Sequence, residues 1–200
     1  MTHPYTSFID KKIILASQSP RRKQLLEWAE VPFEVVVVPT EETYPSSLSL
    51  PEIPIYIAKQ KAVAVREFLI QNKKPHDIII AADTIVVAAG KVTGKPVSEE
   101  NAFEILSGLS GQTHQVITGV YISGLEEHYF SDVTEVAFHD LSEAELRYYI
   151  QQYKPFDKAG AYGIQEWIGV AGIRSINGDF YNVMGLPVSR VLQALKSGKV

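Results

Sequence analysis

The chain has 200 residues, 46% of them hydrophobic, with 19 lysines and arginines against 23 aspartates and glutamates. It is long enough to bury a substantial core, and its net charge of −4 argues against a broad surface that follows nucleic-acid phosphates. Cysteine is absent, which excludes disulfides, thiolate catalysis and cysteine-bound zinc. No run of about 18 apolar residues occurs, and the N-terminus lacks a signal-peptide core, so we expect a soluble cytoplasmic protein without membrane contact.

Apolar runs alternate with helical patterns in the first half of the chain. The pattern predicts a strand at 12–16, a helix at 20–28, a strand at 33–38 and a long helix at 52–70. Two more strands are expected at 77–82 and 85–92. The loop 45–51, rich in Ser, Leu and Pro, could separate two lobes or form a lid.

The second half predicts a sheet with antiparallel members and several helices. We expect a helix from Ser98, strands between 113 and 138 with a turn at 123–124, and a strand near 170–176. Ser142 and Glu145 form a capping box that should start a helix running to about residue 152. Pro187 should open a last helix.

The stretch ILASQSPRR joins an expected strand to an expected helix. Ser19 reads as an N-cap and Pro20 as the first helical residue. The helix N-terminus would then lie beside the hydroxyls of Ser17 and Ser19 and the guanidinium groups of Arg21 and Arg22, a corner suited to a polyanion. The alternative is a well-capped helix with solvated arginines.

Charged residues recur near the expected strand ends. Asp83 follows the apolar run 78–82, so it should lie at the carboxyl end of a buried strand, where α/β sheets bind ligands. Glu42 follows the strand 33–38, and Lys61 falls inside the apolar face of the helix 52–70. Lys95 and Lys158 lie on expected loops. Each has a simpler interpretation: a turn aspartate, a solvated glutamate, or lysines that extend to the surface.

The common metal and nucleotide motifs are missing from the sequence. The five histidines (His3, His76, His114, His128 and His139) show no pair at a zinc-binding spacing, so any metal should be oxygen-ligated. Neither a Walker glycine-lysine loop nor a Gly-x-Ser-x-Gly elbow occurs.

Six short motifs follow one another along nearly the whole chain: ILASQSPRR, AADTIV, GKP, LSGQTHQVITGV, FDKAGAYGIQ and NVMGLP. In order and approximate spacing they resemble the Maf family of nucleoside triphosphate pyrophosphatases. The resemblance implies one Maf-like domain over residues 1–200, with an α/β fold similar to that of inosine triphosphatases: a mixed twisted sheet with flanking helices and two lobes around a cleft. It also implies cleavage of a nucleotide to the monophosphate and pyrophosphate with a divalent cation, Mg²⁺ or Mn²⁺.

Residue by residue, the resemblance assigns phosphate binding to Ser17, Ser19, Arg21, Arg22, Lys61 and Lys95. It matches Asp83 to the family aspartate, the candidate to activate water or to bind the metal, with Glu42 as the second carboxylate. Carboxylates suit hard cations, and arginine and lysine neutralise developing phosphate charge. One departure, Ile53 and Pro54 where the family has an unbroken helical pair, leaves the start of the long helix open.

The branch of the family similar to dTTP and UTP enzymes has arginine after the proline, threonine after the aspartate and glutamine in the Gly-Ile-Gln motif. Here these are Arg21, Thr84 and Gln165. The expectation is therefore a house-cleaning dTTP and UTP pyrophosphatase, with no nucleic-acid partner and with homodimerisation left open. The alternatives are a pyrophosphatase for another modified nucleotide and a nucleotide-binding regulator of cell division or septum formation.

Overall fold

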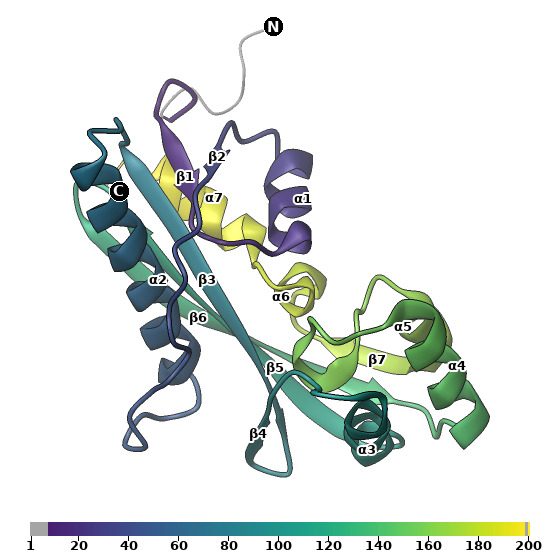
Figure 1. The fold of residues 1–200 in the computed structure, drawn as a ribbon. Helices are drawn as coiled ribbons and strands as arrows, with labels where there is room; N and C mark the ends of the chain where they lie inside the picture. The colour runs from purple at the N-terminus through teal and green to yellow at the C-terminus, as the bar shows by residue number, and fades with distance from the viewer. Residues whose placement is uncertain (1–7, 199) are drawn as a thin grey trace, which may run out of the picture. The chain divides into compact units, whose positions relative to one another are not determined.

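The computed structural model describes residues 8–198 and Val200, so the N-terminal stretch with His3 lies outside the described residues. The strands are β1 (Ile13–Leu15), β2 (Glu34–Val35), β3 (Ile78–Ala88), β4 (Lys91–Thr93), β5 (Thr113–Ser123), β6 (Glu127–Phe138) and β7 (Ile173–Asn177). The helices are α1 (Pro20–Trp28), α2 (Glu52–Gln71), α3 (Glu99–Leu109), α4 (Glu143–Tyr153), α5 (Trp167–Gly172), α6 (Phe180–Met184) and α7 (Val188–Lys196), with a short 3₁₀ turn η1 (Ala159–Ala161) (Figure 1).

The described strands form a mixed sheet in the order β2-β1-β3-β5-β6-β7, with β4 paired to β3. β1 runs parallel to both β2 and β3, as Ile14 shows by its register with Glu34 and Ile79. The pairs β3–β4 and β6–β7 are antiparallel. The expected α/β fold with a mixed sheet and flanking helices is confirmed.

The chain divides into two compact units that are each discontinuous in sequence. Unit 1 comprises residues 1–83, 118–132 and 185–200, and unit 2 comprises 84–117 and 133–184. The loop 45–51 lies wholly within unit 1, so the expectation that it could separate two lobes is wrong. The single domain over 1–200 stays a prediction.

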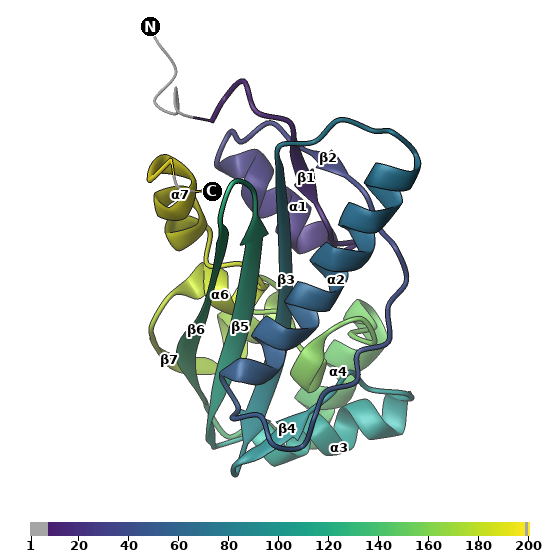
Figure 2. The same cartoon turned by 90° about the vertical axis from the view of Figure 1, so that its left-hand side faces the viewer.

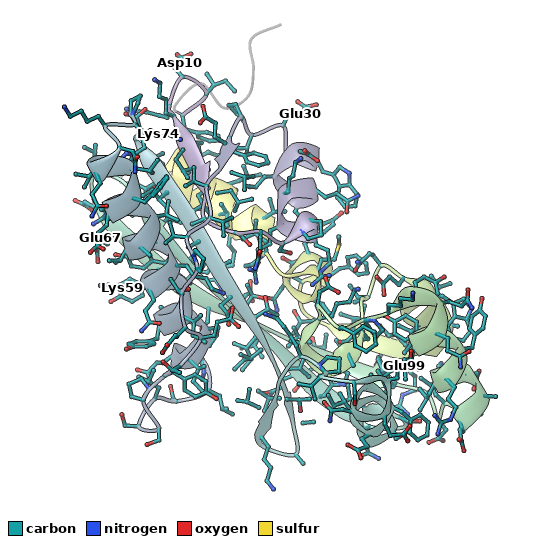
Figure 3. All side chains as sticks on the ribbon, viewed as in Figure 1. Asp10, Glu30, Lys59, Glu67, Lys74 and Glu99 are labelled. Atoms are coloured by element: carbon teal, nitrogen blue, oxygen red, sulfur yellow. The ribbon has the colours of Figure 1, made fainter. Side chains whose placement is uncertain are left out.

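Helix α2 covers one side of the unit 1 strands, and α1 lies on the other side (Figures 1 and 2). The buried residues of α2 and of the strands β1, β3 and β5 form one core. Its members are Ile14, Ala16, Ala58, Ala62, Val65, Leu69, Ile79, Ala81 and Tyr121. The opposite side of α2 is charged, with Lys59 and Glu67 exposed (Figure 3). This amphipathic pattern explains why a long helix forms here.

Two features lie at the start of α2: hydrogen bonds between Glu52 and Ser49, and a close backbone contact. Glu52 accepts bonds from the Ser49 N–H at 2.8 Å and the Ser49 hydroxyl at 2.5 Å, and these bonds lower the pKa of Glu52. The helix runs through Ile53 and Pro54, since proline in a first turn loses no helical bond. A Cβ on Gly119 of β5 would lie 2.2 Å from the Ile55 nitrogen, so only glycine allows this approach.

Strand β3 differs from the sequence-based expectation. Two strands were predicted, at 77–82 and 85–92, with Asp83 after the first, but β3 continues through Asp83 to Ala88. The prediction of a strand end at Asp83 is wrong because no turn residue interrupts the apolar run, and a carboxylate with a partner can sit within a strand. What ends near Asp83 is the pairing with β1, whose last residue Leu15 lies opposite Ile80.

Unit 2 contains α3 and α4, which pack together, with α5, α6, β4 and β7. The expected caps are confirmed: the Ser98 hydroxyl accepts from the Asn101 N–H, and Ser142 and Glu145 form the capping box of α4. The strand expected at 170–176 begins only at Ile173, because residues 167–172 form α5. Helix α6 was not predicted either. In the described part of the chain no helix is long and apolar enough to cross a membrane.

Candidate active site

The first candidate residues lie where β1 ends and α1 begins, in unit 1. Ser19 occupies the N-cap position of α1 with an extended backbone, and Pro20 is the first helical residue, as expected. The Ser19 hydroxyl, however, accepts no bond from the helix N–H groups, so the expected side-chain cap is wrong. The Ser19 N–H instead donates to the Ser17 hydroxyl at 3.2 Å, which folds the loop back on itself. The positive end of the α1 dipole therefore lies beside two hydroxyl groups, which favours negative charge.

Arg22 is a buried cation at this corner, with 8% of its surface exposed. Its Nε donates to the Gly185 carbonyl at 2.7 Å, and its Nη1 donates to the Ser17 hydroxyl at 3.2 Å. Two acceptors in fixed directions hold the planar guanidinium in one orientation. Arg22 and Ser17 were named from the sequence. Gly185 was missed, and its only signal was its place in the NVMGLP motif.

Lys61 joins the two candidate carboxylates. Its Nζ lies 2.7 Å from Glu42 Oε1 and 2.7 Å from Asp83 Oδ1. The side chains of Lys61 and Asp83 are only 17% and 11% exposed, whereas that of Glu42 is 44% exposed. Lys61 thus points inward from α2, and the simpler interpretation of a lysine that extends to the surface does not hold.

Secondary structure explains how these three groups meet. Val36 donates its N–H to the Leu15 carbonyl at 3.2 Å, so the chain after β2 continues along β1 toward Glu42. Asp83 lies on β3, just beyond the residues paired with β1, and Lys61 lies on the helix that covers these strands. The ion pairs are therefore positioned by the core of unit 1.

The charges of the corner and of the carboxylates influence one another. Burial lowers the pKa of Arg22, and the negative charge of Asp83 opposes this lowering. Arg21 adds to the lowering, while Glu42 acts against it. Because arginine stays protonated in proteins, the consequence is a fixed positive charge within electrostatic reach of both carboxylates.

The carboxylates are suited to a hard divalent cation by their chemistry. Asp83 and Glu42 offer oxygen ligands, and their two oxygens lie no farther apart than twice 2.7 Å, because each contacts the same Lys61 nitrogen. The described residues include no group of three or more His, Asp or Glu side chains that could hold a metal alone. A cation here would thus need ligands from substrate or water in addition, as Mg²⁺ commonly does.

The remaining candidates belong to unit 2. Thr84 follows Asp83 on β3 and is partly buried, Lys95 is exposed after β4, and Gln165 is exposed in the turn before α5. The Gly160 N–H donates to the Gly94 carbonyl at 3.2 Å, so the segments of the GKP and FDKAGAYGIQ motifs lie side by side. A Cβ on Gly160 would lie 2.8 Å from the Val86 side chain, which requires glycine at this approach.

Lys158 and His114 have structural surroundings inside unit 2. Lys158 is 7% exposed and pairs with Asp157 at 2.8 Å and Glu166 at 3.2 Å. His114 is buried, its Nε2 lies 2.8 Å from the Tyr162 hydroxyl, and burial lowers its pKa to about 4. Lys158 is thus held by ion pairs and His114 by a hydrogen bond, all within unit 2.

Comparison with known proteins gives the same assignment as the motifs. The family described as Maf-like protein matches residues 12–198. The chain belongs to the Maf family. Among its relatives, a protein of Phocaeicola vulgatus named dTTP/UTP pyrophosphatase is 54% identical over 187 residues, which cover 92% of this chain and 95% of the relative.

Further relatives carry the same name. The protein of Cytophaga hutchinsonii is 55% identical over 92% of this chain and 83% of its own length, and that of Bacteroides thetaiotaomicron is 49% identical over 94% and 97%. Among solved structures, the Ham1 protein of Staphylococcus aureus is similar with a TM-score of 0.44 and 18% identity, over 65% of this chain and 73% of its own.

Proposed function

We propose that this Maf protein hydrolyses dTTP and UTP to the nucleoside monophosphate and pyrophosphate. The relatives with about half of their residues identical carry the name dTTP/UTP pyrophosphatase, and this chain has the arginine, threonine and glutamine of that branch. The observation that carries the proposal is the grouping in unit 1 of a buried arginine, a helix N-terminus, a lysine and two carboxylates.

The phosphates are held by donors of the β1–α1 corner. Ser17, Ser19 and Arg21 contribute hydroxyl and guanidinium groups, and the dipole of α1 adds a fixed partial positive charge. Arg22 supplies a charge that is already oriented by Gly185, so little ordering is needed when the substrate binds. On the GKP motif alone, Lys95 is assigned to phosphate binding as well.

Asp83 and Glu42 would hold the divalent cation, Mg²⁺ or Mn²⁺, which when bound would neutralise phosphate charge and polarise the phosphorus centre. Lys61 keeps both carboxylates in place and balances their charge. In this proposal Asp83 has one of two roles: it binds the cation, or it accepts the proton of the attacking water. Water attacks the α phosphorus. The bond from this phosphorus to the oxygen that bridges the α and β phosphates breaks, and pyrophosphate leaves with that oxygen.

On the residues of the dTTP/UTP branch, base recognition is assigned to Arg21, Thr84 and Gln165. The amide of Gln165 can both donate and accept, which matches the imide edge of uracil or thymine. A site that matches this edge disfavours a base that leaves its donors and acceptors unpaired, whereas the 5-methyl group of thymine is worth only about 1–3 kcal/mol.

Pyrophosphate release tests this function against its alternatives. Incubation with UTP and a divalent cation is expected to yield pyrophosphate and UMP, and chelation is expected to stop the reaction. Binding of UTP without turnover would instead support a nucleotide-binding regulator. Faster release from a modified nucleotide than from UTP would support the other pyrophosphatase alternative.

A further inference from the structure

The turn that carries Gln165 is tied to helix α4 within unit 2. The Glu166 N–H donates to the Gly163 carbonyl at 3.0 Å, which closes the turn over Ile164 and Gln165. The hydroxyl of Tyr149, on α4, accepts from the Gly163 N–H at 3.0 Å and donates to the Glu166 carboxylate. One side chain thus holds both ends of the turn.

The Glu166 carboxylate is fixed on its other side as well. Its Oε1 lies 3.2 Å from Lys158 Nζ, and Lys158 itself is anchored by Asp157. A Cβ on Gly163 would lie 2.8 Å from the Glu166 carboxyl carbon, so the turn and the carboxylate are in close contact. The turn has little room to shift while these contacts persist.

Burial sets Gln165 apart from the residues around it. Residues 160–164 are buried and Glu166 is half-buried, whereas Gln165 is exposed. Helix α5, which begins at Trp167, packs on the turn, since a Cβ on Gly169 would lie 1.7 Å from the Ile164 carbonyl oxygen. The turn therefore projects one polar side chain outward from a rigid base.

We propose that Tyr149 is a positioning residue for base selection: its hydroxyl fixes the 163–166 turn and so sets the direction of the Gln165 amide. This inference rests on the proposed function, in which Gln165 reads the base. Tyr149 acts through Gln165 and is not expected to touch the substrate. The reason is geometric, because a hydrogen bond to a base loses strength when its donor or acceptor turns by a few tens of degrees.

Tyr149→Phe removes the hydroxyl and keeps the ring that stacks on Tyr153 with centroids 5.1 Å apart. We expect the ratio of kcat/KM for UTP to kcat/KM for GTP to fall about tenfold, chiefly through a higher KM for UTP. Tyr153→Phe is the matched control, since it removes a hydroxyl from the neighbouring ring and should leave the ratio unchanged. An unchanged ratio in Tyr149→Phe would overturn the inference.

A double-variant cycle tests whether Tyr149 acts through the amide. If it does, adding Tyr149→Phe to Gln165→Ala should change the UTP to GTP ratio by less than about twofold, since the group it positions is already gone. Two independent, multiplying losses would show that Tyr149 does not act through Gln165 and would overturn the inference.

A spectroscopic signal follows the turn without reference to activity. Trp167 directly follows Glu166 and packs against Tyr148 with ring centroids 5.2 Å apart. In a Trp28→Phe background, Tyr149→Phe is expected to shift the Trp167 emission and increase its quenching by acrylamide. Emission and quenching equal to those of the Tyr153→Phe control would contradict a role in holding the turn.

The outcomes separate the two proposals. If the wild-type protein does not prefer UTP over GTP, the proposed function fails, whatever the fluorescence shows. If the wild-type protein prefers UTP and Tyr149→Phe retains that preference, only the positioning role fails.

Discussion

His114 should make the stability of this protein fall at acidic pH by an amount that the structure specifies. Burial lowers the pKa of His114 from 6.5 to about 4, and its Nδ1 has no partner in the described residues. Protonation would give the buried ring a second N–H group, and the N–H on Nδ1 would have no acceptor among the described residues. The unfolded chain binds the proton near pH 6.5 and the folded chain only near pH 4, so stability present above pH 6.5 is lost as the pH falls through this window.

The size of the loss follows from the shift. Since one pKa unit corresponds to about 1.4 kcal/mol, His114 should account for about 3 kcal/mol of the free energy of unfolding between pH 8 and pH 4. The perturbation is the pair His114→Phe with Tyr162→Phe, which removes the titrating ring and its hydroxyl partner together. Replacing both partners of a buried bond with apolar groups of similar shape is nearly neutral at pH 8.

Urea unfolding of the wild-type protein and of the double variant from pH 8 to pH 4 measures the effect. The difference between the two curves cancels the titration of surface carboxylates and should change by about 3 kcal/mol in favour of the variant as the pH falls. His139→Gln, at an exposed position, is the control and should track the wild-type protein. A difference that stays constant over this pH range would refute the reasoning.

Three further predictions concern the carboxylate, the buried arginine and a glycine contact. Asp83→Asn should lower turnover about 10²- to 10⁴-fold, while its melting temperature stays within a few degrees of that of the wild-type protein. A stable variant with full activity would show that Asp83 has only a structural role. Arg22→Lys replaces the planar donor fork that contacts Gly185 and Ser17 with a single ammonium group, so KM should rise about tenfold with a loss of about 1–3 kcal/mol in stability. An unchanged KM would place Arg22 outside phosphate binding. Gly119→Ala should lower the free energy of unfolding in urea by about 2–4 kcal/mol, because the added Cβ would meet backbone atoms. Gly108→Ala is the control: its Cβ would meet nothing within 4 Å, so it should be neutral or stabilising. Equal effects of the two substitutions would contradict the contact.

Elements with local signals could be predicted from the sequence. The helix 20–28 was predicted with both of its ends, because proline marks its start and the apolar pattern stops at Trp28. The capping box of Ser142 and Glu145 likewise located α4. In these cases the residues that determine the element lie within it or directly beside it.

Elements that depend on distant partners could not be predicted. Asp83 was expected to end a strand because it follows the apolar run 78–82. Its partner is Lys61, which lies 22 positions away in the sequence and reaches it only through the packing of α2 on β3. Helix α5 overlaps the strand that the sequence predicts at 170–176. The close approach of Gly169 to the Ile164 carbonyl is not visible in the residue pattern.

Part of the geometry of the candidate site could be predicted from the sequence. Lys61 was expected to point inward from its helical face, and the structure places it between Glu42 and Asp83. The orientation of Arg22 by Gly185 could not be foreseen, because those two residues are 163 positions apart. The catalytic, phosphate-binding and base-reading roles of these residues stay predictions until variants are measured.

The proposed activity is selective hydrolysis of pyrimidine nucleoside triphosphates to a monophosphate and pyrophosphate. The most direct measurement is kcat/KM for dTTP, UTP, ATP, GTP and 7-methylguanosine triphosphate with Mg²⁺, with products identified by phosphorus NMR. We expect dTTP and UTP to have the highest kcat/KM values, within about tenfold of each other, and pyrophosphate to be the first product. Equal values for purines and pyrimidines, a lead for 7-methylguanosine triphosphate, or release of orthophosphate with a nucleoside diphosphate would contradict it.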